Sequence, residues 1–231
     1  MGRATVDISS ADVTGVIVPL AEPITVTGTV KVEGTQPASN TRLTVSLSSI
    51  ERLPVGSPSG RMTDATSFRL DSVAPDAYYI TFGGLPAGTY VKSVRLSNQE
   101  VLEKGIDLTN TRGTANLDVL LSPKSATLSG VVTDKDQPLS GSYVVILADP
   151  PREAQIYLNK STTTDQNGKF SFSGLAPGDY KLYAWEEYRQ GTTQNPDMAA
   201  PFAQKAIKVS LKESSAESVE LTVLKAEDAR N

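Results

Sequence analysis

A spacing of 102 residues recurs along this chain and limits its fold more than any other feature. The same residue type returns at this spacing in four pairs: Gly28/Gly130, Phe68/Phe170, Pro75/Pro177 and Tyr78/Tyr180. Because a stretch of about 100 residues can bury a core of its own, a repeat of this length predicts two whole domains rather than two turns of a solenoid.

The composition supports two domains and excludes several kinds of chemistry. The 231 residues are 39% hydrophobic, which is enough for two modest cores. The chain has no cysteine and no histidine, so disulfides, Cys/His zinc sites, Cys nucleophiles and Ser-His-Asp triads are excluded. The net charge is −4 with no basic stripe, and the apolar runs are too short to cross a bilayer. We therefore expect no cofactor, no nucleic-acid partner and no membrane insertion.

Alternation of β-branched and small polar residues predicts strands throughout the chain. Residues 24–32 (ITVTGTVKV) and 43–47 have this period of two. Further on, Tyr78, Ile80 and Phe82 share one face, as the core face of a sandwich would.

The end of each unit shows two short apolar patterns, which predict a closing hairpin. The paired segments are 106–108 with 117–121, and 207–209 with 219–223. Only 98–104 and 198–205 have any helical character, and Pro201 interrupts the second.

Two turns in the second unit have strong sequence signals. Residues 165–168 (DQNG) predict a tight turn with positive φ at Asn167 and Gly168, joining the flanking strands as a hairpin. In 175–180 (LAPGDY), Pro177 fixes φ and the following glycine frees it, so that Tyr180 starts the next strand. Both turns specify the fold rather than a reaction.

These motifs resemble a known family. The positions that carry the resemblance are Gly130, Pro138, Leu139, Gly141, Thr164, Asp165, Gly168, Phe170, Leu175, Pro177, Gly178 and Tyr180. They resemble the carboxypeptidase regulatory-like domain, a transthyretin-like (prealbumin-like) seven-stranded β-sandwich related to Cna B-type modules. The first unit shares Pro75 and Tyr78 but has Asp76-Ala77 where the second has Gly178-Asp179.

The resemblance implies an all-β chain of two tandem seven-stranded prealbumin-like β-sandwich domains, at 22–122 and 123–225, followed by a tail at 226–231. Residues 1–21 look like a third closing segment, either the remnant of a preceding repeat or extra N-terminal strands. The phrase YKLYAWEE is similar to multi-repeat secreted or envelope proteins of environmental bacteria, acidobacteria especially. This similarity implies an extracellular or cell-envelope location.

An aromatic group is the best candidate for binding. In KLYAWEEY, Tyr183 and Trp185 fall on one face of a strand with Tyr188 nearby, and flat aromatic rings stack on sugars. The alternative is that Trp185 covers the core or seals the loop at 186–204. The sequence thus predicts either a carbohydrate site at Tyr183, Trp185 and Tyr188 or a packing cluster.

Other candidate sites are weaker. Calcium would need more oxygen ligands than the turn residues Asp134, Asp136, Asp165 and Asn167 supply, which favours solvated turns. An isopeptide bond from Lys31 to Asn116 or Asp118 follows only from the Cna B-type resemblance, and a surface lysine is the simpler interpretation. Glu186 and Glu187 would point to opposite faces of a strand and cannot act as a glycosidase pair. We find no active site and expect no enzyme.

The sequence therefore favours a non-catalytic structural or interaction module, a spacer or an adhesive repeat of a larger secreted or surface protein. The expected partners are other domains of that protein or surface polysaccharides, with loops such as 50–66 and 186–204 presented to them. Carbohydrate binding is the alternative function.

Overall fold

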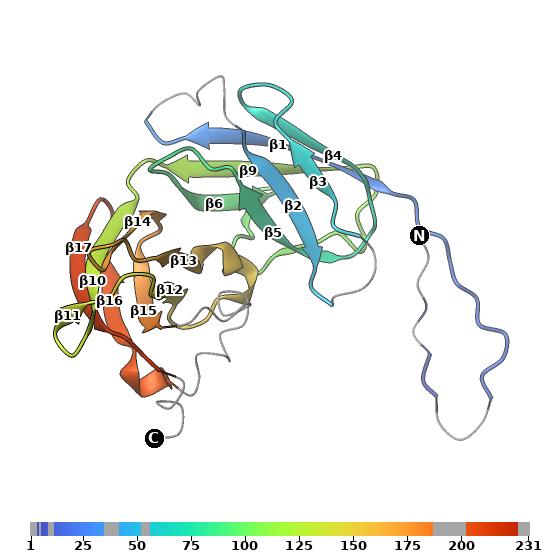
Figure 1. Cartoon of the computed structure of the whole chain (residues 1–231). Coiled ribbons are helices and arrows are strands. Elements are labelled where there is room, and N and C mark those ends of the chain that lie inside the picture. Colours follow the sequence, from blue (N-terminus) through green and yellow to red (C-terminus); the bar gives the residue numbers. More distant parts are fainter. Residues whose placement is uncertain are drawn as a thin grey trace. The chain divides into compact units, whose positions relative to one another are not determined.

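The computed structural model describes residues 4, 6–8, 12–34, 42–51, 56–186 and 202–225. These residues form strands joined by turns, and their helical structure is limited to the 3-10 helix η1 (Glu153–Leu158) and a 3-10 turn at 202–205 (Figure 1). The fold is all-β, as the alternation predicted. Within the described part of the chain, no helix has the length and apolar character needed to cross a membrane.

Two sheets are built from the first half of the chain. Their strands are β1 (Ile24–Val32), β2 (Thr44–Ser49), β3 (Ser59–Arg61), β4 (Ser67–Val73), β5 (Ala77–Gly83), β6 (Tyr90–Leu96), β7 (Gln99–Glu100), β8 (Ile106–Asp107) and β9 (Thr114–Ser122). One sheet has the order β4-β1-β9-β6-β7 and the other β3-β2-β5-β8. Alternate residues of β1 and β5 are buried, as expected for strands with one face toward a core.

Two further sheets are built from the second half. Their strands are β10 (Ala126–Asp134), β11 (Gln137–Pro138), β12 (Tyr143–Ala148), β13 (Lys160–Thr163), β14 (Lys169–Leu175), β15 (Gly178–Trp185), β16 (Ile207–Leu211) and β17 (Ala216–Thr222). One sheet has the order β11-β10-β14 with β17 also on β10, and the other β13-β12-β15-β16. Residues of both sheets, such as Leu128 and Phe170 against Ile146 and Leu182, share one buried core. This half is a β-sandwich.

The chain divides into two compact units, and three of the limits between them fall inside the strands β1, β6 and β9. The first unit draws on Met1–Val30, Pro37–Gly84 and Val94–Val119, and the second on Lys31–Gln36, Leu85–Ser93 and Leu120–Asn231. The last residues of β1 and β9 and the first residues of β6 therefore belong to the second unit. The domain limits 22–122 and 123–225 stay a prediction.

The pairing register of β1 with β4 recurs in β10 with β14 at the spacing found in the sequence. Gly28 lies opposite Phe68, and Gly130 lies opposite Phe170. Each pair of strands also has one irregularity near its end, between Ile24 and Val26 in β1 and at the two positions 102 residues later in β10. The same strand geometry is thus specified twice.

The two glycines explain this register. A Cβ on Gly130 would lie only 2.6 Å from Cζ of Phe170, and a Cβ on Gly28 would overlap the Phe68 ring and lie 2.7 Å from the carbonyl oxygen of Leu117. The phenylalanine ring therefore packs directly on the backbone of the neighbouring strand, where only glycine leaves room.

The two tyrosines of the repeat make the same hydrogen bond. The Tyr78 hydroxyl donates to the carbonyl oxygen of Ala74 at 2.7 Å, and the Tyr180 hydroxyl donates to that of Ala176 at 2.8 Å. Burial raises the pKa of both phenols to about 12. Each hydroxyl is thereby kept as a neutral donor that closes the turn before its own strand.

The predicted hairpins are wrong. β8 pairs with β5 while β9 lies beside β1 and β6, and β16 pairs with β15 while β17 pairs with β10. Each pair of strands is split between two sheets, because alternation fixes which face is buried and not which sheet a strand joins.

Two local predictions also need correction. The turn at 165–168 joins β13 of one sheet to β14 of the other, and of its residues only Gly168 has positive φ, at 70°. Its Asp165 Oδ1 accepts hydrogen bonds from the backbone N–H of Asn167 and Lys169, both at 2.8 Å, which closes the turn without a positive φ at Asn167. In the region 98–104, β7 takes up residues 99–100, and the helical character is limited to one turn in which Gly105 N–H donates to the carbonyl oxygen of Val101 at 2.8 Å.

We expect Gly28→Ala and Gly130→Ala each to lower the free energy of unfolding by about 1–3 kcal/mol, because the added methyl group overlaps both a phenylalanine ring and a backbone carbonyl oxygen of the neighbouring strand, that of Leu117 or Val219. Urea denaturation would measure this. The matched control is Gly83→Ala, where the nearest atom to the added Cβ is Thr44 Cβ at 3.9 Å. Equal stability of all three variants would contradict the close packing of the rings.

Candidate functional site

The predicted aromatic site lies on β15, between β12 and β16 in the sheet β13-β12-β15-β16 of the second unit. Leu182 and Ala184 face the main core, while Tyr183 and Trp185 face the other side, as the alternation predicted. The rings of Tyr183 and Trp185 stack with centroids 5.2 Å apart and an interplanar angle of 15°. Phe202 meets Trp185 edge-on at 5.8 Å.

This aromatic face is covered. Tyr183 is 4% exposed, Trp185 3% and Phe202 1%, and Leu224 belongs to the same buried cluster. Sugar stacking needs an open ring face, so a sugar would have to displace Phe202 first. Tyr188, the third residue of the predicted site, lies outside the described residues. The carbohydrate site stays a prediction.

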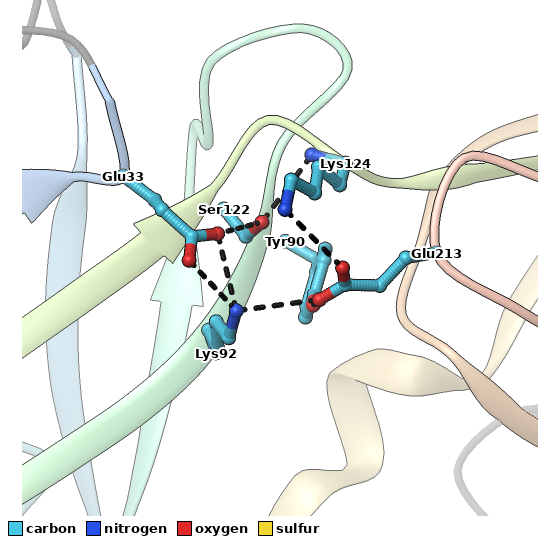
Figure 2. A network of polar contacts seen from close by, with 6 residues as sticks. All are labelled: Glu33, Tyr90, Lys92, Ser122, Lys124 and Glu213. Atoms are coloured by element: carbon cyan, nitrogen blue, oxygen red, sulfur yellow. Dashed lines mark hydrogen bonds and ion pairs between the residues drawn. The ribbon is translucent and has the colours of Figure 1, made fainter.

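A polar network in the second unit brings together residues that are far apart in the sequence (Figure 2). Its members are Glu33 after β1, Tyr90 and Lys92 on β6, Ser122 at the end of β9, Lys124 before β10, and Glu213 between β16 and β17. The sequence analysis missed this network, because polar groups whose contacts span 59 to 123 positions of the chain give no local pattern.

Lys92 is the centre of the network. Its Nζ donates to Glu33 Oε1 at 2.9 Å and to Glu33 Oε2 at 3.1 Å, and it also donates to Glu213 Oε1 at 3.3 Å. Figure 2 shows the ammonium group between the two carboxylates. One lysine thus neutralises two acids that would otherwise repel each other.

Hydroxyl groups and a second lysine complete the network. Ser122 Oγ donates to Glu33 Oε2 at 2.8 Å, and the Tyr90 hydroxyl donates to Glu213 Oε1 at 3.0 Å. Lys124 Nζ lies 3.6 Å from Glu213 Oε2. Each carboxylate therefore has an ammonium group and a hydroxyl as partners.

The contacts lower the pKa values of the two acids and raise those of the lysine and the tyrosine. The hydrogen bond from Lys92, helped by Ser122, lowers the pKa of Glu33 below its usual value of 4.5. The hydrogen bonds from Tyr90 and Lys92 lower the pKa of Glu213 in the same way. Hydrogen bonds to both carboxylates raise the pKa of Lys92, and burial raises that of Tyr90. All four groups are held in the form that binds the others.

This arrangement favours holding segments together over proton transfer. A general acid or base needs a pKa near the working pH, whereas here the acids are made more acidic and the lysine more basic. The side chains of Lys92 and Glu33 are 34% and 35% exposed, so water also screens the network.

Lys160 is a second polar group that the sequence analysis missed. Its Nζ donates to the carbonyl oxygens of Ser173 and Gly174, at 2.7 Å and 2.8 Å, and so connects the start of β13 to the end of β14. Burial lowers its pKa. The lysine satisfies two carbonyl groups that would otherwise be left without a donor at the end of a strand.

The weaker candidate sites are engaged in other contacts. Asp134 accepts a hydrogen bond from Lys225 at 2.8 Å, and the described residues hold no cluster of three or more acidic side chains that would suit a metal ion. Asp118 accepts a hydrogen bond from Thr29 at 2.7 Å, and Asn116 accepts one from Thr27 at 3.3 Å. Asn116 and Asp118, the two possible partners of Lys31 in an isopeptide bond, are thus hydrogen-bonded to threonines of β1.

A family model matches one segment of the second half of the chain. Residues 127–223 match the family model of the carboxypeptidase regulatory-like domain. This match confirms the resemblance for that segment, which spans β10 to β17. No curated protein matches the sequence.

Several solved structures are similar to the chain at low identity. The Bacillus anthracis TIE protein is 12% identical with a TM-score of 0.31, over 88% of this chain and 34% of that one. A minor pilin of Streptococcus agalactiae is 14% identical with a TM-score of 0.34, over 87% of this chain and 95% of the pilin. The shaft pilin SpaA of Lactobacillus rhamnosus GG is 11% identical with a TM-score of 0.30, over 87% and 97%. No functional conclusion rests on similarities this low.

The network predicts a pH dependence of stability. Because the folded-state pKa of Glu33 and Glu213 is lowered from 4.5, their pairing stabilises the fold above about pH 4.5 and is lost as the pH falls through the folded-state pKa. Replacing both acids by glutamine should lower the free energy of unfolding at pH 7, and the difference from the parent chain should vanish in acid. Chemical denaturation between pH 7 and pH 3 would measure it.

The control for this experiment is Glu217→Gln, which changes one exposed acid of β17 outside the network. It should leave the pH dependence unchanged. A glutamine double variant that is as stable as the parent chain at pH 7 would show that the network contributes nothing.

Proposed function

We propose that this chain is a non-catalytic structural module of a larger extracellular or cell-surface protein, where it spaces other domains or supports their contacts. The observation that carries the proposal is that the polar side chains of the network in the second unit bind one another. Lys92 joins two carboxylates, and each of these has a hydroxyl donor as well. Such groups fix the positions of the segments that bear them.

Two further observations support a structural role. The segment 127–223 matches a family of regulatory-like domains. The aromatic residues of β15, the best candidates for ligand contact in the sequence, are buried against Phe202 and Leu224. The side chains best suited to recognition are therefore engaged in holding the fold.

The location can be tested on cells that produce the protein. An antibody raised against the purified chain should label intact cells, and external protease should remove the label before lysis. Labelling that needs permeabilised cells would contradict an extracellular position. A cytosolic protein of the same cells serves as the control for membrane integrity.

A second candidate function is carbohydrate binding, favoured by the near-parallel stacking of Tyr183 and Trp185. It requires Phe202 to leave its position against the Trp185 ring. Carbohydrate binding involves Trp185, whereas the structural role does not require a ligand there. A titration with polysaccharides therefore distinguishes the two functions.

The chain has a single tryptophan, and its emission reports directly on this site. With a panel of polysaccharides we expect no change in Trp185 emission, because the ring is buried. The control is Phe202→Ala, which opens the edge of the ring. A saturable shift in the parent chain, whether or not the variant binds more tightly, would overturn the purely structural role.

A further inference from the structure

An apolar arm precedes the first strand. Of the nine large hydrophobic side chains that are exposed in the described part of the chain, seven lie between positions 6 and 20: Val6, Ile8, Val13, Val16, Ile17, Val18 and Leu20. Ile17 is 83% exposed and Leu20 85%. A run this apolar and this exposed marks a surface that another molecule covers.

The arm has the pattern of the last strand of each unit. Val16, Val18 and Leu20 correspond in order to Leu117, Val119 and Leu121 of β9, which are 0%, 2% and 0% exposed. In β17 and just after it, Leu221 and Val223 are likewise buried. Yet residues 12–19 pair with no strand among the described residues. Leu20 forms a single β-bridge. The arm therefore has the sequence of a strand, but in the part that the structure describes it has almost no strand pairing.

The second unit has a strand edge that fits such a segment. β9 lies between β1 and β6, whereas β17 pairs with β10 and with no second strand in the part of the chain that the structure describes. β17 runs parallel to β10, with Thr127 N–H donating to Ser215 and Val223 N–H donating to Thr133. Because successive N–H groups of a strand alternate in direction, those of Ser218 and Glu220 point to the outer edge.

An apolar hollow lies beside this edge. It has a volume of about 300 Å³ and is lined by β15, the start of β16 and the end of β17, including Leu182, Ile207 and Val223. Ile207 is 40% exposed and is one of only two large exposed hydrophobics described outside the arm. Alternate side chains of an added strand would cover Ile207 and enter the hollow.

The surfaces on both sides of the contact carry few charges of one sign. Residues 12–20 have a single charged side chain, Asp12. The hollow is lined by both Lys205 and Glu220, and Lys208 follows on β16. The contact between the arm and this edge is therefore mainly apolar.

We propose that residues 12–20 of the arm of one copy add as a strand to the outer edge of β17 in a second copy, with Val16 and Val18 packed toward Ile207. The contact joins two different surfaces, so it repeats from copy to copy and builds a linear assembly. This inference rests on the proposed structural role and makes it more specific, because it names a second copy of the chain as the partner.

Sedimentation velocity of the full chain from micromolar to submillimolar concentration tests the proposal. The parent chain should show a mass that rises with concentration. The arm variant Val16→Lys/Val18→Lys should stay monomeric, and so should Ile207→Asp, which places a charge where the apolar side chains of the arm would pack. The matched control Ile156→Lys changes the other exposed hydrophobic outside the arm and should associate like the parent chain.

Mixing the two monomeric variants gives the sharper result. The arm variant keeps an intact β17 edge and the Ile207 variant keeps an intact arm, so together they should form a 1:1 dimer that grows no further. Circular dichroism of each variant alone confirms that it is folded.

A parent chain that stays monomeric throughout, an arm variant that still associates, or a mixture that does not dimerise would each overturn the inference. If the chain is monomeric and the antibody still labels intact cells, the self-association is overturned, but the proposed structural role at the cell surface is not. Binding of the arm to another protein only, seen with a monomeric parent chain, would also overturn it.

Discussion

Close packing of a phenylalanine ring on the backbone of a neighbouring strand is the constraint on which the rest of the fold depends. The ring of Phe170 lies where a side chain on Gly130 would be, and Phe68 stands in the same relation to Gly28. Since a shift of one residue exchanges the two faces of a strand, this contact fixes which residues of β1 and β10 are buried. The register of the adjacent strands follows from it.

Once the register is fixed, the turns between sheets can be fixed as well. Tyr180 lies at the start of β15, and its hydroxyl returns to the carbonyl oxygen of Ala176 in the turn before it. Asp165 closes the turn between β13 and β14 through two backbone N–H groups. These contacts are local, but they connect strands of opposite sheets and therefore determine how the layers meet.

The polar network shows a different use of charge. Lys92, Glu33 and Glu213 come from three separate segments and meet within the second unit. Partly exposed pairs of this kind contribute modestly to stability, and their main effect is on specificity of position. A module that spaces or supports other domains needs its segments in fixed positions, which is the role we propose.

The sequence by itself determined the strands, their buried faces and the paired landmarks from Gly28 to Tyr180, because period-two alternation and glycine or proline at turns are local properties. It also separated Leu182 from Tyr183 on β15. Only the tertiary structure decided that β8 and β9 join different sheets and that Phe202 covers Trp185. The network around Lys92 was also decided only by the tertiary structure. Such contacts join residues far apart in the chain, and no local pattern encodes which distant partner a strand edge, a ring or a charge will meet.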